Sequence, residues 1–454
     1  MNTVLQHNFD CIPGPTHQYH GLAHGNPHAE QSAGLVSNPR KAALQGLRKA
    51  RALQDQGVPQ ALLPPHARPY LALLVKTGFL AMADIDNAVS ADNFDALSRE
   101  LERVAQAEPD LVGSCFSASS MWAANWATVT PSSDSLDGRC HFSTANLASN
   151  LHRAIEATHS ASILRKIFSA ANLFTVHEPL AANIAVMDEG AANHMRLCKK
   201  HGERGIHVFC YGIGGIRRVP ADGPYVARQT RLASRAVAVQ GAIPETMWML
   251  VRQSDAAIAS GVFHNDVIAM SNESLIICHE AAFDNQDLVR TRVIQWAADF
   301  GISLDWVQIS EDQLSLSRSV QTYFFNSQIV RTHGDRTVLV CDNRCKSDHD
   351  VLQIVGSLID KGQVSSVIYV DLEESLRNGG GPACVRLRVE LNSVEVEAIK
   401  TYHGLNPTRG TWDRLERIIN KSYPDQWGSG NIPSGQIIRQ CFEATAEIST
   451  CLGI

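Results

Sequence analysis

The sequence predicts an α/β protein built from repeated units of a hairpin and a helix. From about residue 115 onward, short apolar segments of β type occur in pairs separated by a turn. In VIAMSNESLIICH (267–279) we expect the turn at Ser-Asn, and in SQIVRTHGDRTVLVCD (327–342) we expect it at His-Gly-Asp. Segments of helical character, such as residues 281–301, lie between these pairs.

A faint repeat runs through the same region. An Asn or a Cys precedes a strand-like or apolar segment at intervals of roughly 60 to 70 residues, at Asn125, Asn193, Asn265, Asn326 and Cys384. Large α/β proteins also produce hairpins at such intervals without true repetition, so the spacing leaves both interpretations open. Because no linker rich in Pro or Ser interrupts this region, we expect a single domain over residues 1–454. A closed ring of repeats would satisfy both observations.

The segment before this region contains one clear helix pattern. In PRKAALQGLRKARALQDQG (39–57), Ala43, Leu44, Leu47 and Ala52 recur near helical spacing with basic residues between them. Proline at the first position suits the start of a helix. We therefore expect an amphipathic surface helix here.

Composition narrows the class of protein. Of the 454 residues, 44% are hydrophobic and 19% are charged, and the formal net charge is -6, which favours neither disorder nor nucleic acid as a partner. The first residues lack a signal-peptide pattern, and no apolar stretch reaches the roughly 20 residues that a bilayer requires. We expect a cytoplasmic protein with no membrane partner. The eleven cysteines are scattered singly, which predicts reduced, buried thiols.

The stretch NGGGPACVRLRV (378–389) is the first candidate for chemistry. Three consecutive glycines allow unusual backbone angles or close approach of a ligand, and Pro382 stiffens the chain after them. Cys384 is therefore presented from a shaped loop at the start of a strand, as a nucleophile would be. A buried thiol beside an ordinary turn is the alternative.

A cysteine nucleophile needs an acid/base and an orienting carboxylate, which FHND (263–266) can supply. His264 and Asp266 lie two residues apart, and in a strand this spacing directs both side chains to the same face. The same sequence is also compatible with a surface histidine beside a turn-forming Asn-Asp pair.

DEGAANH (188–194) contributes a further carboxylate, Glu189. The small residues that follow it leave room for a flat cation such as guanidinium to approach and form two hydrogen bonds. An acid that caps a helix is equally compatible with this pattern.

Two groups of metal-ligand residue types also occur. No Cys or Glu stands at zinc-site spacing in the first group, and buried-strand and loop positions explain the second more simply. We therefore expect no metal and no cofactor. The groups are His17, His20, His24 and His28, and Cys341, Cys345 and His349.

Six motifs together resemble one family. NGGGPAC, FHNDV, DEGAANH, SASSMWAANWATVTPSSDSLDG, VSNPRKAALQGL and LPPHARP are similar, in colinear order from about residue 6 to 400, to the N-succinylarginine dihydrolases among the enzymes that modify guanidino groups. The last 50 residues match only loosely. The resemblance implies a pentein fold, an α/β propeller of five pseudo-symmetric ββαβ-type units, which would account for the faint repeat.

The resemblance also implies roles for individual residues. Cys384 is expected to be the nucleophile, His264 the general acid/base, and Glu189 the carboxylate that binds the guanidinium, with Asp266 as a second ligand of that cation. His24 departs from the family pattern, which has a bulkier apolar or aromatic residue there. Further substrate contacts are expected from the segment from His20 to Glu30 and from four other segments, at His20, Gly21, Leu22, Ala23, His24, Gly25, Asn26, Asn125, His152, Arg153, Arg228 and Asn378.

The activity implied by the resemblance is hydrolysis of N2-succinylarginine to N2-succinylornithine, in arginine catabolism by the succinyltransferase route. Two ammonia and carbon dioxide would be released through a covalent thioether on Cys384. The substrate carries one cation and two carboxylates, so we expect a site that is acidic at Glu189 and Asp266 and basic at Arg153 and Arg228. The family also suggests a homodimer.

Three other functions remain open from the sequence. A deiminase or amidinotransferase acting on another guanidino substrate would use the same thiol, but an enzyme for agmatine would not need Arg153 and Arg228 directed at a carboxylate. A non-catalytic binding protein on the same scaffold would tolerate alkylation of the thiol. A metal-dependent hydrolase would lose activity to chelators.

Overall fold

A computed structural model describes residues 4–90, 92–215, 225–428 and 430–454. Within these residues the strands form five sheets of three strands and one sheet of two. The α/β class predicted from the sequence is confirmed.

The five larger sheets share one topology. In each, the first strand runs antiparallel to the second, and the second runs parallel to the third. Each unit therefore contains a third strand in addition to the hairpin and the helix that the sequence predicts. The sheets are β4 (Ala127–Thr130), β5 (Cys140–Thr144) and β6 (Phe174–His177); β7 (His194–Leu197), β8 (Ile206–Tyr211) and β9 (Trp248–Arg252); β10 (Ala269–Asn272), β11 (Leu275–His279) and β12 (Asp305–Ile309); β13 (Gln328–Arg331), β14 (Thr337–Asp342) and β15 (Ser366–Val370); and β16 (Arg386–Leu391), β1 (Leu5–Cys11) and β3 (Gln60–Leu63).

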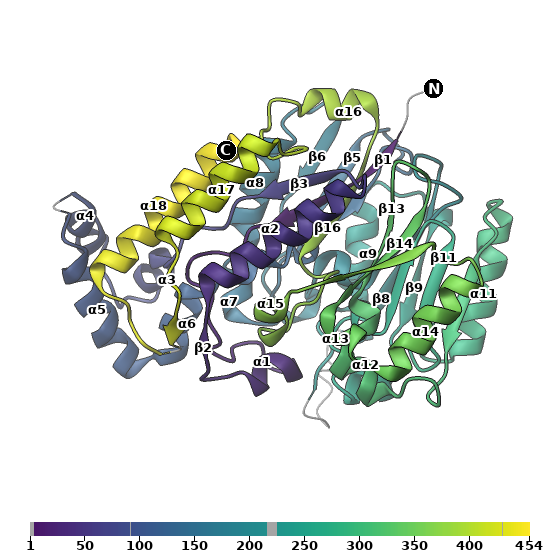
Figure 1. Ribbon diagram of the computed structural model, residues 1–454, viewed down its shortest axis with the longest axis horizontal. Coiled ribbons are helices and arrows are strands. Elements are labelled where there is room, and N and C mark those ends of the chain that lie inside the picture. The colour runs from purple at the N-terminus through teal and green to yellow at the C-terminus, as the bar shows by residue number, and fades with distance from the viewer. Residues whose placement is uncertain (1–3, 91, 216–224, 429) are drawn as a thin grey trace.

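Helices connect the second strand of each sheet to the third, because two parallel strands need a crossover between them. In the fifth sheet this helix is α2 (Pro39–Asp55), which lies along β1 and β3 (Figure 1). The side chain of Asn38 caps α2 by accepting a hydrogen bond from the Lys41 N–H at 2.7 Å. The predicted helix over residues 39–57 is thus confirmed. The other crossovers contain α7 (Leu151–Ala154) and α8 (Ala157–Ile167), α9 (Arg231–Gln240), α11 (Gln286–Asp299), and α13 (Asn343–Lys346) and α14 (His349–Asp360).

A short turn precedes the first strand of each sheet, and the residues singled out by the faint repeat lie in these turns. Four of the turns are 3-10 helices, η2 (Ala123–Asn125), η4 (Gly190–Asn193), η6 (Asn265–Val267) and η7 (Phe324–Asn326), and the fifth contains Cys384. Hydrogen bonds join each turn to the next: Ala124 N to Cys384 O (3.0 Å), Asn125 Nδ2 to Glu189 O (2.7 Å), Asn265 N to Asn193 Oδ1 (2.9 Å), Asn326 Nδ2 to Asp266 O (3.3 Å) and Ala383 N to Asn326 O (2.8 Å).

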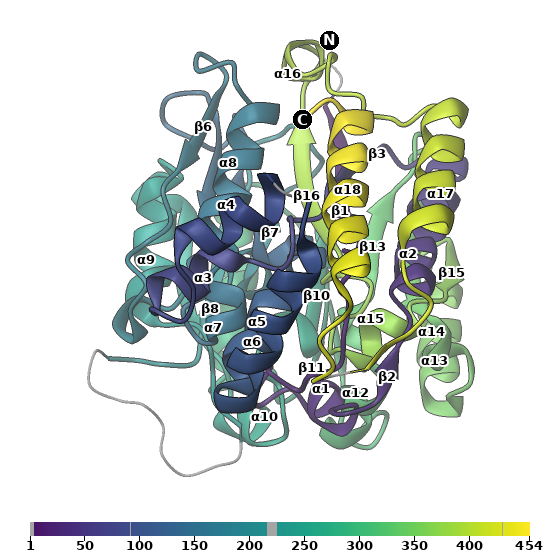
Figure 2. The ribbon, with the colours of Figure 1, turned by 90° about the vertical axis from the view of Figure 1, so that its left-hand side faces the viewer.

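The last part of the chain covers a helical region at one side of the sheets. Figures 1 and 2 show α5 (Phe94–Ala107) near α18 (Gly435–Leu452), and their apolar faces share one core with α3 (Leu71–Lys76) and α6 (Pro109–Phe116). This packing gives the loosely matching last 50 residues a structural role. Beside them, β2 (Val36–Ser37) pairs with β17 (Trp427–Gly428).

Two local predictions need correction. The hairpin of residues 267–279 turns at Glu273 and Ser274, two residues later than expected, because Asn272 pairs with Leu275. Glu273 adopts a φ of 50°, a conformation for which sequence preferences favour Gly or Asn. The helix expected over residues 281–301 begins only at Gln286. In contrast, the hairpin of residues 327–342 does turn around His-Gly-Asp.

All eleven cysteines are free and buried, as expected for reduced thiols. None of the helices in the described part of the chain is both long and apolar enough to cross a membrane. The remaining elements are α1 (Pro27–Gln31), α4 (Met82–Ser90), α10 (Asp255–Ala259), α12 (Leu316–Thr322), α15 (Glu373–Arg377), α16 (Ser393–Ala398), α17 (Arg409–Ser422), η1 (Ser119–Met121), η3 (Ile184–Val186) and η5 (Glu245–Met247).

Candidate active site

The glycine loop brings other side chains close to the thiol. Gly379 has a φ of 95°, and a Cβ atom there would lie 1.9 Å from the Asn26 side-chain nitrogen. A Cβ atom on Gly381 would lie 2.6 Å from the Asn326 side-chain oxygen. The loop therefore excludes side chains so that Asn26 and Asn326 can approach its backbone.

Cys384 lies in the turn directly before β16, only 5% exposed, and contacts two polar groups. Asn326 Nδ2 donates a hydrogen bond to its Sγ at 3.3 Å, and Asp266 Oδ2 lies 3.7 Å from the same atom. This environment differs from that of an ordinary buried cysteine, because the Asn326 amide can stabilise a thiolate and the Asp266 carboxylate accepts a hydrogen bond from the thiol.

His264 and Glu189 form the second pair of the site. His264 Nε2 lies 3.0 Å from Glu189 Oε2, and the other ring nitrogen is buried without a hydrogen-bond partner among the described residues. Ser149 Oγ and Arg153 Nη1 also donate to the Glu189 carboxylate, at 2.6 and 2.5 Å. Although Glu189 stands at the N-cap position of η4, its side chain makes no capping hydrogen bond. Glu189 therefore orients the imidazole.

The expected arrangement of His264 and Asp266 on one face of a strand is wrong. His264 has extended backbone angles, but Asp266 already belongs to the 3-10 turn η6. The turn rotates Asp266 away from the His264 side chain, so Asp266 lines the central cavity described below while His264 lines the cavity on the other side of Cys384. The two side chains still approach the nucleophile, from different sides.

Burial sets the protonation of the site without substrate. It raises the pKa of Cys384 well above its usual value and lowers the pKa of His264 to about 4. It also raises the pKa of Asp266 to about 7, against a smaller opposing effect of its hydrogen bonds. For Glu189, burial opposes ionisation, but the charge of Arg153 and the contact with His264 outweigh it and hold its pKa well below the usual range. At neutral pH the Glu189 carboxylate is therefore ionised, whereas the Cys384 thiol keeps its proton and the His264 imidazole is neutral.

Two arginines give the cavity its positive side. The Arg228 guanidinium lies over the Phe263 ring at 4.5 Å and donates to the His24 carbonyl at 2.6 Å. Arg153 lies 5.9 Å above the Trp122 ring, and its Nη2 is buried with no hydrogen-bond partner among the described residues. Arg153 therefore contacts Glu189 through one nitrogen and has a second nitrogen free for a ligand.

Most of the expected residues meet in two adjoining cavities that share Ala23 and Trp122. The first is lined by Ala23, Asn26, Trp122, Asn125, Arg153, Arg228, Phe263, His264, Gly379 and Cys384. The second is lined by Gln18, His20, Gly21, Leu22, Ala23, Ser117, Trp122, His152 and Asn378. Neither cavity is lined by His24, whose side chain is exposed, or by Gly25, whose N–H donates to Glu30 at 2.8 Å.

Sequence reasoning missed several residues of the site. The sequence marks Asn326 only as a member of the repeat, and this periodicity is the signal that places it in the turn before the turn of Cys384. Ser149 and Gln229, which hold Glu189 by its carboxylate and by its N–H, carried no motif that sets them apart. Trp122 lines both cavities, and its buried indole N–H has no hydrogen-bond partner among the residues that the structure describes.

Comparison with known proteins agrees with this geometry. Among solved structures, the N-terminal domain of ArgZ, an arginine dihydrolase from the ornithine-ammonia cycle in cyanobacteria, bound to product, matches with a TM-score of 0.51. The match covers 85% of this chain and 97% of that domain at 14% sequence identity. The fold thus places the chain in the pentein class of mixed α/β proteins, to which arginine dihydrolases belong.

Sequence comparison is more specific. The succinylarginine dihydrolase family matches residues 3–454. N-succinylarginine dihydrolase from Nitrosospira multiformis is 38% identical over 448 residues, which cover 98% of this chain and 96% of that protein. The protein of the same name from Legionella pneumophila (strain Paris) is 38% identical over 451 residues, with the same coverage. The chain belongs to the succinylarginine dihydrolase family.

Proposed function

We propose that the protein hydrolyses N2-succinylarginine to N2-succinylornithine, releasing two ammonia and carbon dioxide, as a step in arginine catabolism. One observation carries this proposal. Cys384 lies between Asp266, at 3.7 Å from its Sγ, and a cavity that also contains His264, Arg153 and Arg228. A nucleophile, an acid/base and two groups that bind carboxylates are thereby available to one substrate.

The first half of the reaction begins with binding of the guanidinium. Its positive charge favours ionisation of the Cys384 thiol, whose proton passes to His264, and Asn326 donates a hydrogen bond to the resulting thiolate. The thiolate attacks the guanidinium carbon, the C–N bond to a terminal nitrogen breaks, and His264 protonates that nitrogen as ammonia leaves. The product of this step is an amidino thioether on Cys384.

Hydrolysis then restores the thiol. His264, now neutral, takes a proton from water as the water attacks the thioether carbon, and the C–S bond breaks to give a ureido product. A second cycle on that product releases the second ammonia, and the carbamate left on the amine loses carbon dioxide. Two waters are consumed for two ammonia and one carbon dioxide, so atoms and charge balance.

The charges of the cavity support a substrate with opposite charges at its two ends. Glu189 and Asp266 would face the guanidinium, and Arg228 with the free Nη2 of Arg153 would face the succinyl carboxylates. In the structure without substrate Arg153 is paired with Glu189 itself. We propose that substrate replaces this contact, since a second guanidinium competes for the same carboxylate.

Ammonia stoichiometry tests the function directly. Purified protein is incubated with N2-succinylarginine or free arginine until the reaction is complete, ammonia is counted, and the product is identified by mass. We expect two ammonia per succinylarginine and an inert free arginine. One ammonia, or a preference for free arginine or agmatine, would instead indicate a deiminase or a related enzyme for another guanidine and would refute the assignment of the carboxylate-binding side.

The family resemblance and the hydrogen bonds between successive turns support a finer description of the fold. We propose that the five units close into a pseudo-fivefold ring and that residues 1–454 form a single catalytic domain. We also propose a cytoplasmic homodimer without other macromolecular partners, on the family resemblance alone. Light scattering coupled to gel filtration measures the mass, and a monomer at micromolar concentration would contradict the dimer.

A further inference from the structure

A third cavity lies behind the nucleophile. Its volume is about 100 Å³, and the first strand of each three-stranded sheet contributes to its wall: β4, β7, β10, β13 and β16. Asp266 and Ala383 line the end nearest Cys384. The cavity is therefore separated from the substrate cavities by Cys384 and Asp266 and forms a compartment of its own.

The sequence of β16 determines the charges in this cavity. Alternate side chains of RLRVEL point to opposite faces of the strand. Leu387, Val389 and Leu391 are buried in an apolar core, whereas Arg386, Arg388 and Glu390 line the cavity. One strand thus places two guanidinium groups and one carboxylate around a small space.

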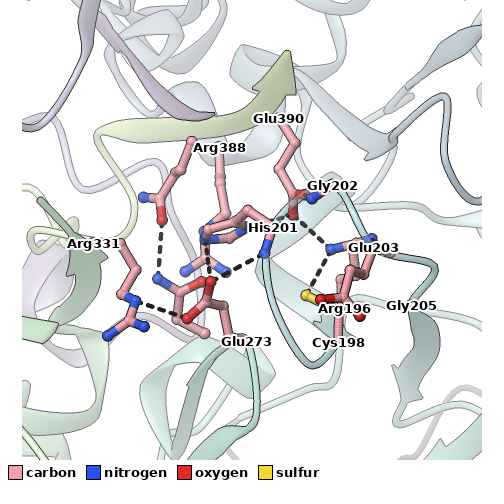
Figure 3. Close-up of polar contacts among 12 residues, drawn as sticks. Arg196, Cys198, His201, Gly202, Glu203, Gly205, Glu273, Arg331, Arg388 and Glu390 are labelled. Atoms are coloured by element: carbon pink, nitrogen blue, oxygen red, sulfur yellow. Dashed lines mark hydrogen bonds and ion pairs between the residues drawn. The ribbon is translucent and has the colours of Figure 1, made fainter. Parts of the chain in front are cut away.

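The charge of the Glu390 carboxylate is already compensated by neighbouring side chains. Glu390 Oε1 lies 2.7 Å from Arg196 Nη1 and 2.8 Å from His201 Nδ1, and Glu390 Oε2 accepts from the Gly202 N–H at 3.1 Å. Arg196 is further bound by Asp134. Figure 3 shows the contacts of Glu390 with Arg196, His201 and Gly202. Glu273 in the same view is bound by Arg331 at 2.8 Å and accepts the His201 N–H at 3.0 Å.

The two arginines of β16 are not neutralised in this way. Among the described residues neither Arg386 nor Arg388 forms an ion pair with a carboxylate. Arg386 is only 9% exposed, and its Nε and Nη1 have no hydrogen-bond partner in the described part of the chain. Arg388 donates to the Ser271 carbonyl at 2.9 Å but leaves Nε unpartnered. The nearby Asp10 is held by Lys49, with both oxygens 2.7 Å from Nζ.

Burial of the Arg386 and Arg388 guanidinium groups costs free energy, and the nearby carboxylates of Asp10 and Asp266 (for Arg386) and of Glu390 and Glu273 (for Arg388) offset this cost only in part. Burial lowers the pKa of Arg388 to about 10 and that of Arg386 well below its usual value. A negatively charged partner would remove this penalty. The cavity is large enough for a small ion and holds unpaired donors for it.

A metal ion does not suit the same region. Cys198, His201 and Glu390 offer ligand atoms within 4.8 Å of one another. However, the Arg196 guanidinium lies 2.9 Å from Cys198 Sγ as well as 2.7 Å from Glu390. A cation already occupies the place between these ligands, so the ligand that the cavity lacks is an anion.

We propose that the cavity enclosed by the first strands binds a small, planar, monovalent oxyanion between Arg386 and Arg388. Guanidinium groups match planar oxyanions because two N–H donors align with two oxygens. Nitrate, formate and bicarbonate belong to this class and fit the volume. The site does not depend on the proposed reaction, since its residues are separated from the substrate cavities by Cys384.

Thermal unfolding of the full-length protein tests the proposal. Sodium nitrate replaces sodium gluconate at constant ionic strength, because gluconate is a much bulkier anion than nitrate. An anion that binds only the folded state raises the unfolding midpoint in a saturable way. We expect this rise for the wild type and its loss in Arg386→Met, which keeps an unbranched apolar stem in place of the arginine stem but removes the guanidinium.

Arg439→Met is the matched control, since Arg439 forms its ion pairs with Asp92 and Glu443 at the surface of α18. This variant should keep the nitrate response. If Arg386→Met does not fold, crystals of the wild type soaked in bromide provide the second readout, with an anomalous peak expected next to Arg386 and Arg388. A wild type without a nitrate response, an equal response in folded Arg386→Met, or bromide-soaked crystals with only water in the cavity would overturn the proposal.

Discussion

The turns that contain Asn193 and Asn326 have the same position in their sheets but different neighbours. Each asparagine ends a 3-10 turn just before a first strand, and only Ser327 separates Asn326 from β13. The Asn193 side chain accepts the Asn265 N–H at 2.9 Å and so joins two turns. The Asn326 side chain joins two turns as well, through the Asp266 carbonyl, and in addition donates to Cys384 Sγ at 3.3 Å. A repeated scaffold contact thus becomes part of a reaction site where the next turn supplies a thiol.

Replacing the thiol should have the largest effect on activity, because it removes the group that distinguishes this turn from the others. We expect Cys384→Ser to lose at least about a thousandfold in kcat, because a serine hydroxyl at this position has no base strong enough to ionise it. Substrate binding and the unfolding midpoint should stay close to the wild type. Steady-state kinetics, calorimetric binding and thermal unfolding measure the three quantities. Turnover near the wild-type rate would remove Cys384 as the nucleophile.

Replacing Asn326 and replacing Asn193 should have different effects on kcat. Asn326→Ala is expected to lower kcat by about ten- to a hundredfold, because the thiolate loses its amide donor. The rate of Cys384 alkylation should also shift to higher pH. Asn193→Ala is the matched control: it should lower stability by about 1 to 2 kcal/mol but keep kcat. Equal kcat values for the two variants would mean that Asn326 is only structural.

Arg228 should affect binding more than chemistry. Arg228→Lys keeps a positive charge but loses the planar fork and its stacking on Phe263, so we expect KM for succinylarginine to rise by about tenfold with a smaller change in kcat. Arg439→Lys, on the exposed side of α18, serves as control. An unchanged KM would show that Arg228 does not contact the carboxylate side of the substrate.

The pKa of Asp266 predicts a pH dependence. Since burial raises it to about 7, the carboxyl group is protonated below that pH and cannot pair with the guanidinium. We expect kcat/KM to fall by about tenfold per pH unit below pH 7. A profile that stays flat from pH 7 to pH 5 would contradict this role of Asp266.

The raised pKa of Asp266 should also make the stability of the protein depend on pH, though more weakly than the activity. A carboxyl group whose pKa is raised by folding destabilises the folded state increasingly as pH rises from its unfolded value to its folded value. For Asp266 this window runs from 3.8 to about 7. Asp266→Asn should therefore unfold at a higher temperature than the wild type. The difference in unfolding temperature should increase with pH across this window and stay constant above pH 7. An advantage that is constant from pH 4 to pH 8 would refute the shift.

Individual residues show which parts of the fold and of the site could be predicted from the sequence. The α/β class and the helix over residues 39–57 were predictable from local patterns, whereas the grouping of Cys384, His264 and Glu189 was predictable only from the family resemblance of their motifs. The contact of Asn326 with Cys384 was not, since it depends on how two units 58 residues apart pack together. The turn at Glu273 was missed for another reason: tertiary contacts stabilise a backbone conformation that glutamate rarely adopts.

The pairing of Arg153 with Glu189 was also beyond local pattern. The sequence assigned the two residues to opposite sides of the site, and only the tertiary fold brings Arg153 of α7 within 2.5 Å of Glu189, which precedes η4. Charge alone could not indicate that an arginine would occupy the place expected for the substrate cation.

Acid-quenched mass spectrometry tests the central claim, that the turn with Cys384 carries the reaction. Wild-type protein is mixed with saturating N2-succinylarginine, quenched within the first turnovers, and digested. The account predicts that the peptide containing Cys384 gains the mass of the substrate less one ammonia, whereas Cys384→Ser gains nothing. Turnover without any adduct, or an adduct on another of the eleven cysteines, would contradict it.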